Sequence, residues 1–431
     1  MKTIFECSTH KIEYTLGQHE ALTKVDNFLK SKDNFFLLAG YSGCGKTTIA
    51  ENIANFSKAM LTAPTNAAVN RLREKISNPS LEYNTIHSLL YVPTEKPGVF
   101  EKTKGFKPNK TYIVDECSMI DEYLLEDLIA EGLKNNSKVI FMGDSFQLEP
   151  IGKDPKIFSW EKVRPDVFFE GNRCELTEVK RYDGDLLNIA TEMRTTGEPE
   201  FNKIESDDLL ILDKFSKELI KDIKSNASYI VLTSTNDKRL KYNEAIRAIR
   251  YKTVEDLSYA QRGDKLVSVS NSNNYSNGET FELNDALLIG EFRFSIRESN
   301  DEYTNVQAFL YKENEELIFL LPHLKAPSFH GAEFVKIYKD GLATIPYNLK
   351  KLILVDIPKK NMLFWNKKVT IATYGYAVSC HKAQGQEWDN VYIDAQWLMP
   401  IWNKARWFYT AITRAKVKVQ VAANKYLKEI K

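Results

Sequence analysis

Short apolar runs alternate with stretches of helical spacing along the first third of the chain. Each run is followed by polar turn residues and then by apolar positions that recur at helical spacing. This alternation predicts a parallel sheet whose strands are joined by helical crossovers. The expected strands are residues 35–39, 59–63, 111–114 and 138–142, and the expected helices are residues 46–57, 67–76 and a stretch that ends near residue 134.

The rest of the chain shows the same alternation, interrupted by a region of different texture. From about residue 257 to residue 344, short β-like runs are separated by turn signals such as Asn277-Gly278. Such runs predict a small β-barrel or sandwich inserted into a second α/β unit. The elements expected around it are strands at residues 229–232, 369–372, 392–394 and 418–422 and helices at residues 237–250 and through 409–414.

Composition changes this picture in a few respects. The chain has 431 residues, enough for roughly three domains, and its 43% hydrophobic and 27% charged residues are typical of a soluble globular protein. It has no apolar run of the roughly 18 residues that span a membrane, and no secretory signal. Five cysteines without C-x-x-C spacing argue for a reducing cytosol and against disulfides and zinc. Because the net charge is only +1, a polyanionic partner would have to be bound by local basic patches.

The stretch after the first apolar run carries the strongest chemical signal. Residues 40–47 match G-x-x-x-x-G-K-[ST] at every fixed position. Backbone N–H groups of such a loop curl around phosphate oxygens, and the helix that follows points its positive end at them. Lys46 would reach the β- and γ-phosphates, and the Thr47 hydroxyl would bind Mg²⁺. The chain is therefore expected to bind a nucleoside triphosphate with Mg²⁺, through residues Gly40, Gly43, Cys44, Gly45, Lys46, Thr47 and Thr48.

Polar side chains with catalytic potential follow the later strands of the first half. Asp115 can hold Mg²⁺, and Glu116 can orient or deprotonate an attacking water. Burying two adjacent carboxylates for packing alone would be costly. Farther along, Gln147 could sense the γ-phosphate, and Arg181 offers the bidentate cation that a closing phosphate contact requires.

Several candidates remain open from their spacing alone. Gln18 could present its amide to an adenine edge or could belong to a helix cap. Thr65 and Asn66 are equally compatible with helix capping and with ligand contact at the end of a strand. Residues 91–110 form either a solvated loop or a functional insertion that contains a small hairpin. His381 alone is more typical of a packed histidine than of a functional one.

Taken in order, these motifs resemble those of the superfamily-one helicases, in the branch that contains RecD and the phage Dda helicase. The resemblance covers most of the chain and keeps the motif order of the family. The corresponding segments are residues 40–47 (motif I), 63–68 (Ia), 85–87 (Ib), 115–116 (II), 143–147 (III), 176–181 (IV), 379–387 (V) and 409–414 (VI).

The resemblance implies two RecA-like P-loop lobes, residues 1–183 and 184–431, with ATP between them. A strand-separating pin is expected at about residues 91–110 and an SH3-like β-rich insertion at about residues 257–345. The implied nucleotide residues are Gln18, Lys46, Thr47, Asp115, Glu116 and Gln147 on the first lobe, Arg181 at the junction, and Gly385, Glu387 and the arginine finger Arg414 on the second.

The resemblance also implies a path for single-stranded DNA and a way to open a duplex. An aromatic at the tip of the pin could stack on the junction base pair, which contributes about 1–3 kcal/mol per base, and Phe100 is the candidate. Asn66 departs from the Dda-like pattern, which has a histidine there, so Thr65 is the stronger candidate. The implied DNA-binding residues are Pro64, Thr65, Asn66, Thr85, His87 and Phe100 in the first lobe and Thr235, Asn236, Ser379, His381 and Lys382 in the second.

The leading hypothesis is an ATP-dependent helicase that moves 5′ to 3′ on single-stranded DNA as its lobes close and reopen. The alternatives are an RNA helicase and a nucleotide-switched nucleic-acid-binding protein that moves nothing. The presence of both Glu116 and Arg414 favours turnover, because a switch usually borrows its arginine. We expect a monomer that acts on single strands and fork junctions in the cytoplasm of a bacterial or phage-infected cell. A single-strand-binding or replisome protein is the candidate partner.

Overall fold

The computed structural model describes residues 3–7, 13–76, 78–93, 100–102, 104–148, 170–180, 184–196, 209–212, 217–254, 257–269, 272, 274–275, 277–297, 303–313, 316–323, 333–337, 369–394 and 401–422. The chain divides into two compact units. Unit 1 comprises residues 1–210, 384–388 and 398–419, and unit 2 comprises residues 211–383, 389–397 and 420–431. Three segments that the sequence assigned to the second lobe, 184–210, 384–388 and 398–419, therefore belong to the first compact unit. The lobe border at residues 183 and 184 stays a prediction.

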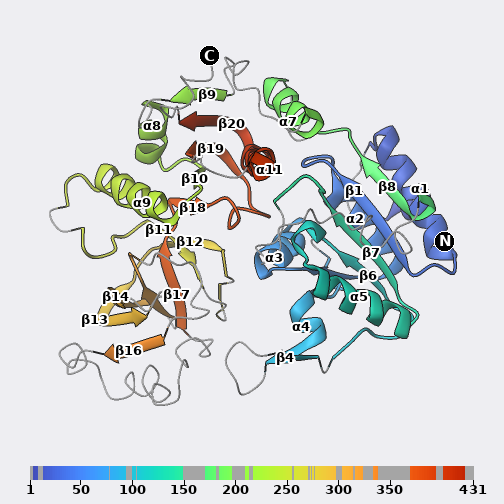
Figure 1. Cartoon of the computed structure of the whole chain (residues 1–431), viewed down its shortest axis with the longest axis horizontal. Helices are drawn as coiled ribbons and strands as arrows, with labels where there is room; N and C mark the ends of the chain where they lie inside the picture. The colour runs from blue at the N-terminus through green and yellow to red at the C-terminus, as the bar shows by residue number, and fades with distance from the viewer. Residues whose placement is uncertain are drawn as a thin grey trace. The chain divides into compact units, whose positions relative to one another are not determined.

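Unit 1 is built on a six-stranded parallel sheet in the order β3-β2-β6-β7-β1-β8 (Figure 1). The four strands expected from the sequence are confirmed, each to within one residue at either end. The strands are β1 (Phe35–Gly40), β2 (Met60–Ala63), β3 (Tyr83–Thr85), β6 (Thr111–Val114), β7 (Lys138–Gly143) and β8 (Arg173–Leu176).

Helices cover both faces of this sheet, because the residues of β1 point alternately to the two sides. Phe36 and Leu38 pack in the core cluster that α1 and α2 share, whereas Phe35 and Leu37 pack in the cluster of α4 and α5 (Figure 1). The helices of unit 1 are α1 (Leu16–Lys30), α2 (Lys46–Ser57), α3 (Asn66–Lys75), α4 (Ile86–Leu90), α5 (Glu122–Lys134), α7 (Gly184–Thr196) and α11 (Ile401–Ile412), with the 3₁₀ turns η1 (Ile4–Glu6), η2 (Cys117–Met119) and η3 (Glu170–Asn172).

The expected hairpin in the first half of the chain is present. Strands β4 (Tyr91–Pro93) and β5 (Phe100–Lys102) pair antiparallel, with Pro93 opposite Phe100. The Tyr91 hydroxyl donates to Asp127 on α5, and Lys102 Nζ lies 2.8 Å from Asp127 Oδ1, so the base of the hairpin is fastened to α5. Residues 94–99 and the Phe100 side chain lie outside the described residues.

Unit 2 contains most of a five-stranded sheet in the order β18-β10-β19-β20-β9. Parallel pairing of β10 with β18 and β19 and the helix after β10 confirm the α/β element order expected there. These elements are β9 (Leu209–Leu212), α8 (Lys217–Ser225), β10 (Tyr229–Thr233), α9 (Asn236–Arg250), β18 (Ala377–Ser379), β19 (Trp388–Asp394) and β20 (Ala415–Ala422).

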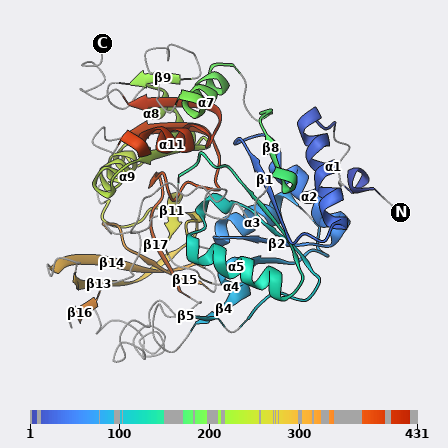
Figure 2. The same cartoon turned by 45° about the vertical axis from the view of Figure 1, so that its right-hand side comes forward.

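The β-rich region forms a seven-stranded sheet in the order β12-β11-β17-β15-β14-β13-β16, in which β13 and β14 are a long antiparallel pair (Figure 2). Strand β17 lies between β11 and β15, so this sheet takes in a strand beyond the expected end of the insertion. The SH3-like resemblance of the region stays a prediction. The strands are β11 (Asp264–Ser268), β12 (Thr280–Leu283), β13 (Leu287–Arg297), β14 (Tyr303–Glu313), β15 (Glu316–Leu320), β16 (Glu333–Ile337) and β17 (Val369–Tyr374).

A buried ion pair fastens α9 to β11. Arg247 Nε lies 3.1 Å from Asp264 Oδ1, and the Tyr376 hydroxyl donates to the same oxygen over 2.8 Å. Arg247 also donates to the backbone carbonyls of Leu257 (2.8 Å) and Tyr259 (2.7 Å). The pair therefore holds the segment between α9 and β11 against the sheet.

Among the helices that the structure describes, we find none that is both long enough and apolar enough to cross a membrane.

Candidate active site

The loop between β1 and α2 has the backbone geometry that a phosphate cradle requires. Gly43 and Gly45 have φ angles of +84° and +83°, a left-handed conformation that glycine adopts without strain. A Cβ on Gly40 would lie 2.7 Å from Cys44 Sγ, so the start of the loop also needs glycine. The first turn of α2 begins at Lys46 and presents its free N–H groups toward this loop.

Lys46 lies along this loop. Its Nζ donates to the carbonyls of Gly40 (2.8 Å) and Tyr41 (2.9 Å). A cation held by neutral carbonyls in a phosphate loop is free to exchange them for phosphate oxygens, which bind it more strongly. Thr47 and Thr48 follow in the first turn of α2.

The helix-capping alternative is confirmed for Gln18, whose side chain also contacts the phosphate loop. It forms a capping box with Thr15 at the start of α1, and its Nε2 donates to Cys44 O over 3.0 Å. Its side chain is therefore anchored at the edge of the phosphate loop and is 2% exposed. Contact with an adenine stays a prediction.

An open cavity of about 670 Å³ lies beside the phosphate loop. Tyr41 lines it, together with residues 177–179 and the polar side chains Asn188, Thr191 and Glu192 on α7. A cavity of this volume is large enough for a nucleotide base and sugar.

Asp115 and Glu116 stand at the carboxyl end of β6, as expected. Burial and the neighbouring Glu116 raise the pKa of Asp115 to about 6. Glu116 has a φ angle of +49°, a strained conformation for a residue with a side chain, of the kind that clusters at functional sites. In the described part of the chain we find no group of three or more His, Cys, Asp or Glu side chains that could hold a metal ion by themselves. A carboxylate and a hydroxyl (Thr47) suit Mg²⁺, which usually keeps several waters and binds phosphate oxygens as well.

Arg71 on α3 is a site residue that the sequence analysis missed. Its guanidinium lies 3.6 Å from Glu116 Oε1, forms an ion pair with Glu387 and donates to Gly385 O over 2.8 Å. Burial lowers its pKa, and Glu116 opposes that shift. Lys75, one helical turn later, lies 3.4 Å from the same Glu387 oxygen. Two basic residues spaced i, i+4 after a strand end were the signal that could have identified them.

Arg414 is 1% exposed, and its guanidinium donates to two backbone carbonyls. Its Nε donates to Thr410 O over 3.0 Å, and Nη1 to Gln386 O over 3.4 Å. Gly385 and Glu387 flank Gln386, so these three candidates lie close together within unit 1.

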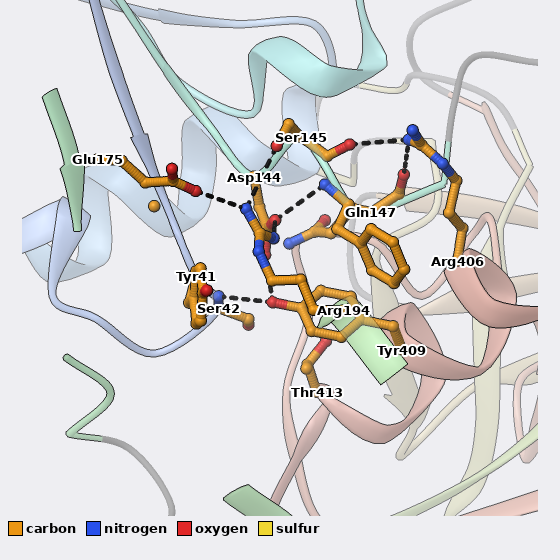
Figure 3. A network of polar contacts seen from close by, with 12 residues as sticks. Tyr41, Ser42, Asp144, Ser145, Gln147, Glu175, Arg194, Arg406, Tyr409 and Thr413 are labelled. Carbon is orange, nitrogen blue, oxygen red and sulfur yellow. Dashed lines mark hydrogen bonds and ion pairs between the residues drawn. The ribbon is translucent and has the colours of Figure 1, made fainter. Parts of the chain in front are cut away.

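Gln147 lies in the loop that follows β7 and is 4% exposed. Its backbone N–H bonds to Asp144 O over 3.2 Å, and Arg406 donates to its carbonyl over 3.3 Å (Figure 3). Its side-chain Oε1 has no hydrogen-bond partner among the described residues, as expected of a group that awaits a ligand or water. Arg181 lies outside the described residues.

The candidate nucleic-acid residues of unit 1 occupy the carboxyl ends of two neighbouring strands. Ala63 of β2 pairs with Thr85 of β3, so Pro64, Thr65 and Asn66 lie beside the segment of Thr85 and His87. Thr65 and Thr85 cap α3 and α4, which confirms the capping alternative for Thr65 without testing nucleic-acid contact. Burial lowers the pKa of His87, which favours its neutral form.

The candidates of unit 2 are arranged in the same way. Thr233 of β10 pairs with Ser379 of β18, which brings Thr235 and Asn236 close to the segment of His381 and Lys382. Thr235 caps α9. Burial lowers the pKa of His381.

Lys382 and Arg239 are two cations of unit 2 whose surroundings favour the uncharged form. Burial and the nearby Arg239 lower the pKa of Lys382 to about 8, and burial lowers that of Arg239 to about 10. A bound anion would oppose both shifts, because an opposite charge favours the charged form. Arg239, which the sequence analysis missed, therefore joins the candidates.

Two family models match the chain: an AAA domain over residues 13–212 and a UvrD-like helicase C-terminal domain over residues 374–422. The ATP-dependent DNA helicase dda of Enterobacteria phage T4 is 29% identical over 208 residues, which cover 44% of this chain and 45% of that protein. The RecBCD enzyme subunit RecD of Buchnera aphidicola (subsp. Schizaphis graminum) is 22% identical over 94% of this chain and 73% of its own length.

Among solved structures, the Pif1 helicase from Bacteroides in complex with ADP-AlF3 and ssDNA matches with a TM-score of 0.51. The alignment covers 97% of this chain and 96% of that chain, at 15% identity. The two-lobe RecA-like fold expected from the sequence is thereby confirmed.

Proposed function

Because the chain belongs to the superfamily-one helicases of the RecD, Dda and Pif1 branch, we propose that it is an ATP-dependent DNA helicase. It hydrolyses ATP, moves 5′ to 3′ on single-stranded DNA and unwinds duplex DNA ahead of it. The observation that carries the proposal is the juxtaposition, within one unit, of a phosphate-loop lysine, a strained carboxylate after β6, the partly buried Arg71 and the buried Arg414.

Each of these groups has a task in phosphoryl transfer. Lys46 and the N–H groups of the loop hold the phosphates, and Glu116 orients and deprotonates the attacking water. Thr47 and Asp115 would hold Mg²⁺, which would neutralise charge on the phosphates. Arg414 exchanges its carbonyl partners for the developing charge on the γ-phosphate and stabilises the transition state.

The nucleic acid is bound at two grips, one in each unit. The first is the segment around Thr65 and His87, and the second is formed by Thr235, Ser379 and Lys382. A cycle of ATP binding and hydrolysis that changes the distance between the grips moves the strand. The β4–β5 hairpin, fastened to α5 through Asp127, is the strand-separating pin.

Hydrolysis should be tested with single-stranded DNA, single-stranded RNA and no nucleic acid, and unwinding with duplexes that carry a 5′ or a 3′ tail. We expect stimulation by DNA and unwinding of the 5′-tailed duplex. Stimulation of hydrolysis by RNA alone would identify RNA as the substrate. No stimulation by DNA or RNA would favour a nucleotide-switched binding protein.

The pin is tested by Phe100→Ala. Loss of base stacking should slow unwinding about tenfold and leave DNA-stimulated hydrolysis and single-strand translocation unchanged. Equal loss of all three activities would identify Phe100 as a core residue instead.

A further inference from the structure

A buried network connects the phosphate loop to the loop that carries Gln147, and the chemistry above leaves it unused (Figure 3). Its centre is Asp144, whose side chain is 0% exposed. Arg194 of α7 forms an ion pair with Asp144 Oδ1, and the N–H of Phe146 donates to the same oxygen over 3.0 Å. The Tyr409 hydroxyl donates to Oδ2 over 2.6 Å.

Tyr409 extends this network to the phosphate loop. Its hydroxyl accepts the backbone N–H of Ser42 over 3.1 Å while it donates to Asp144. The direction of the second bond is fixed, because an ionised carboxylate can only accept. The hydroxyl oxygen is therefore left facing Ser42, as Figure 3 shows.

The guanidinium of Arg194 links α7 to three other segments: the loop after β7, strand β8 and the phosphate loop. Besides Asp144 it donates to Ser145 Oγ (3.3 Å) and Glu175 Oε1 (2.9 Å), and it lies 4.1 Å from the ring centre of Tyr41 in the phosphate loop. Its side chain is 9% exposed, so its loss would leave the Asp144 carboxylate buried without its cation.

We propose that Arg194 is a positioning residue for recognition of the nucleoside triphosphate. By holding Asp144, it fixes the Tyr409 hydroxyl against the phosphate loop and sets the loop of Gln147. Asp144 and Gln147 share one turn, since the N–H of Gln147 bonds to Asp144 O, so a displaced Asp144 moves the side chain assigned to the γ-phosphate. The inference rests on the proposed function, because it takes residues 40–47 to bind phosphates.

If Arg194 positions the groups that sense the γ-phosphate, its loss should weaken binding of a triphosphate more than binding of a diphosphate. General destabilisation of the protein would weaken both to the same extent. The affinities of a non-hydrolysable ATP analogue and of ADP, both with Mg²⁺, should be measured by calorimetry for Arg194→Met. We expect the dissociation constant of the analogue to rise about tenfold or more and that of ADP less than about threefold. Arg194→Lys, which keeps the charge but not the fork, should recover part of the loss.

The matched control is Arg247→Met, which removes from unit 2 an arginine of similar burial that is also paired with a buried aspartate. It should lower thermal stability and change both affinities by the same factor. Equal weakening of analogue and ADP in Arg194→Met, or no change in either, would overturn the inference.

Tyr409→Phe removes a single oxygen atom and tests the route of the effect. In the Arg194→Met background it should weaken analogue binding by less than about twofold, because Asp144, the acceptor of the hydroxyl, is no longer held in place by Arg194. Full multiplication of the two effects would show that Arg194 does not act through Tyr409. If Arg194→Met does not fold, Tyr409→Phe alone decides, and it must weaken the analogue selectively. Analogue binding retained in Lys46→Ala would instead overturn the phosphate-loop assignment, and this inference with it.

Discussion

Two buried arginine–aspartate pairs, one in each unit, are built from the same parts. Arg194 with Asp144 and Arg247 with Asp264 each receive a tyrosine hydroxyl on the carboxylate, at 2.6 and 2.8 Å. Each guanidinium also lies over a tyrosine ring, at 4.1 and 4.0 Å. In both, burial acts to lower the pKa of the arginine and the anionic surroundings outweigh it, so the pKa lies above its ordinary value.

The two pairs differ in what the remaining bonds hold. Arg247 donates its other hydrogen bonds to the backbone carbonyls of Leu257 and Tyr259, and these bonds fix one short segment of chain. Arg194 donates its other hydrogen bonds to the side chains of Ser145 and Glu175. The tyrosine of this pair, Tyr409, accepts a hydrogen bond from a backbone N–H of the phosphate loop. The difference teaches that charge pairing does not by itself reveal a role: the Arg247 pair holds a segment of chain, whereas the Arg194 pair contacts the phosphate loop through Tyr409.

The largest effect on ATP hydrolysis is expected from a substitution in the phosphate loop, which Arg194 contacts and Arg247 does not. Lys46→Ala should reduce ATP hydrolysis about a hundredfold or more, because it removes the cation that contacts the phosphates. Hydrolysis should be measured at saturating DNA, with the exposed Lys32→Ala as control. Normal turnover in Lys46→Ala would mean that the loop is not a phosphate site, and Arg194 would then be as structural as Arg247.

The structural side of the comparison is tested by Asp264→Ala. Removing one partner leaves Arg247 buried without its carboxylate, so the free energy of unfolding of the region should fall by about 3–5 kcal/mol. Urea unfolding measures this loss, and the rate of hydrolysis per folded molecule should stay unchanged. A selective loss of triphosphate binding in this variant would erase the distinction between the two pairs.

A third arginine, the partly buried Arg71, contacts the candidate base directly and should show its effect in turnover. Arg71→Met should lower kcat about tenfold with a smaller change in KM, because Glu116 loses the cation 3.6 Å from its oxygen. Steady-state kinetics would measure this, with Arg71→Lys as partial rescue. Arg73→Met, two residues along the same helix and exposed, is the control; an equal loss there would point to α3 as a whole.

The smallest effect is expected at Lys382 and Arg239 of unit 2. Their pKa values lie below the ordinary values, whereas those of Arg194 and Arg247 lie above them. Lys382, with a pKa of about 8, is mostly protonated at pH 7 and mostly neutral at pH 9. If the bound phosphate requires the charged form, affinity for single-stranded DNA should fall about tenfold between these pH values. Fluorescence anisotropy at constant ionic strength would measure this. Lys382→Gln should bind more weakly at pH 7 and lose the dependence on pH; an unchanged dependence would assign it to another group.

The elements that depend on neighbouring residues could be predicted from the sequence. The strands of the first sheet, the glycine-bearing loop before α2 and the acids after β6 follow from local patterns, because backbone geometry and burial are set within a few residues. The place of β17, which pairs with β11 and β15 in the β-rich sheet, could not be predicted in this way. An apolar strand carries no signal for which sheet it will join.

Residue types and their spacing thus determined what chemistry the chain offers: a phosphate loop at 40–47, carboxylates at 115 and 116, and an arginine at 414. The tertiary structure decided which charges meet. Tyr409 and Ser42 are 367 residues apart in the chain, and Arg71 reaches Glu387 from another element altogether. The physical reason is that a charged side chain acquires its role from its burial and its partners, and both are created only when distant segments pack together.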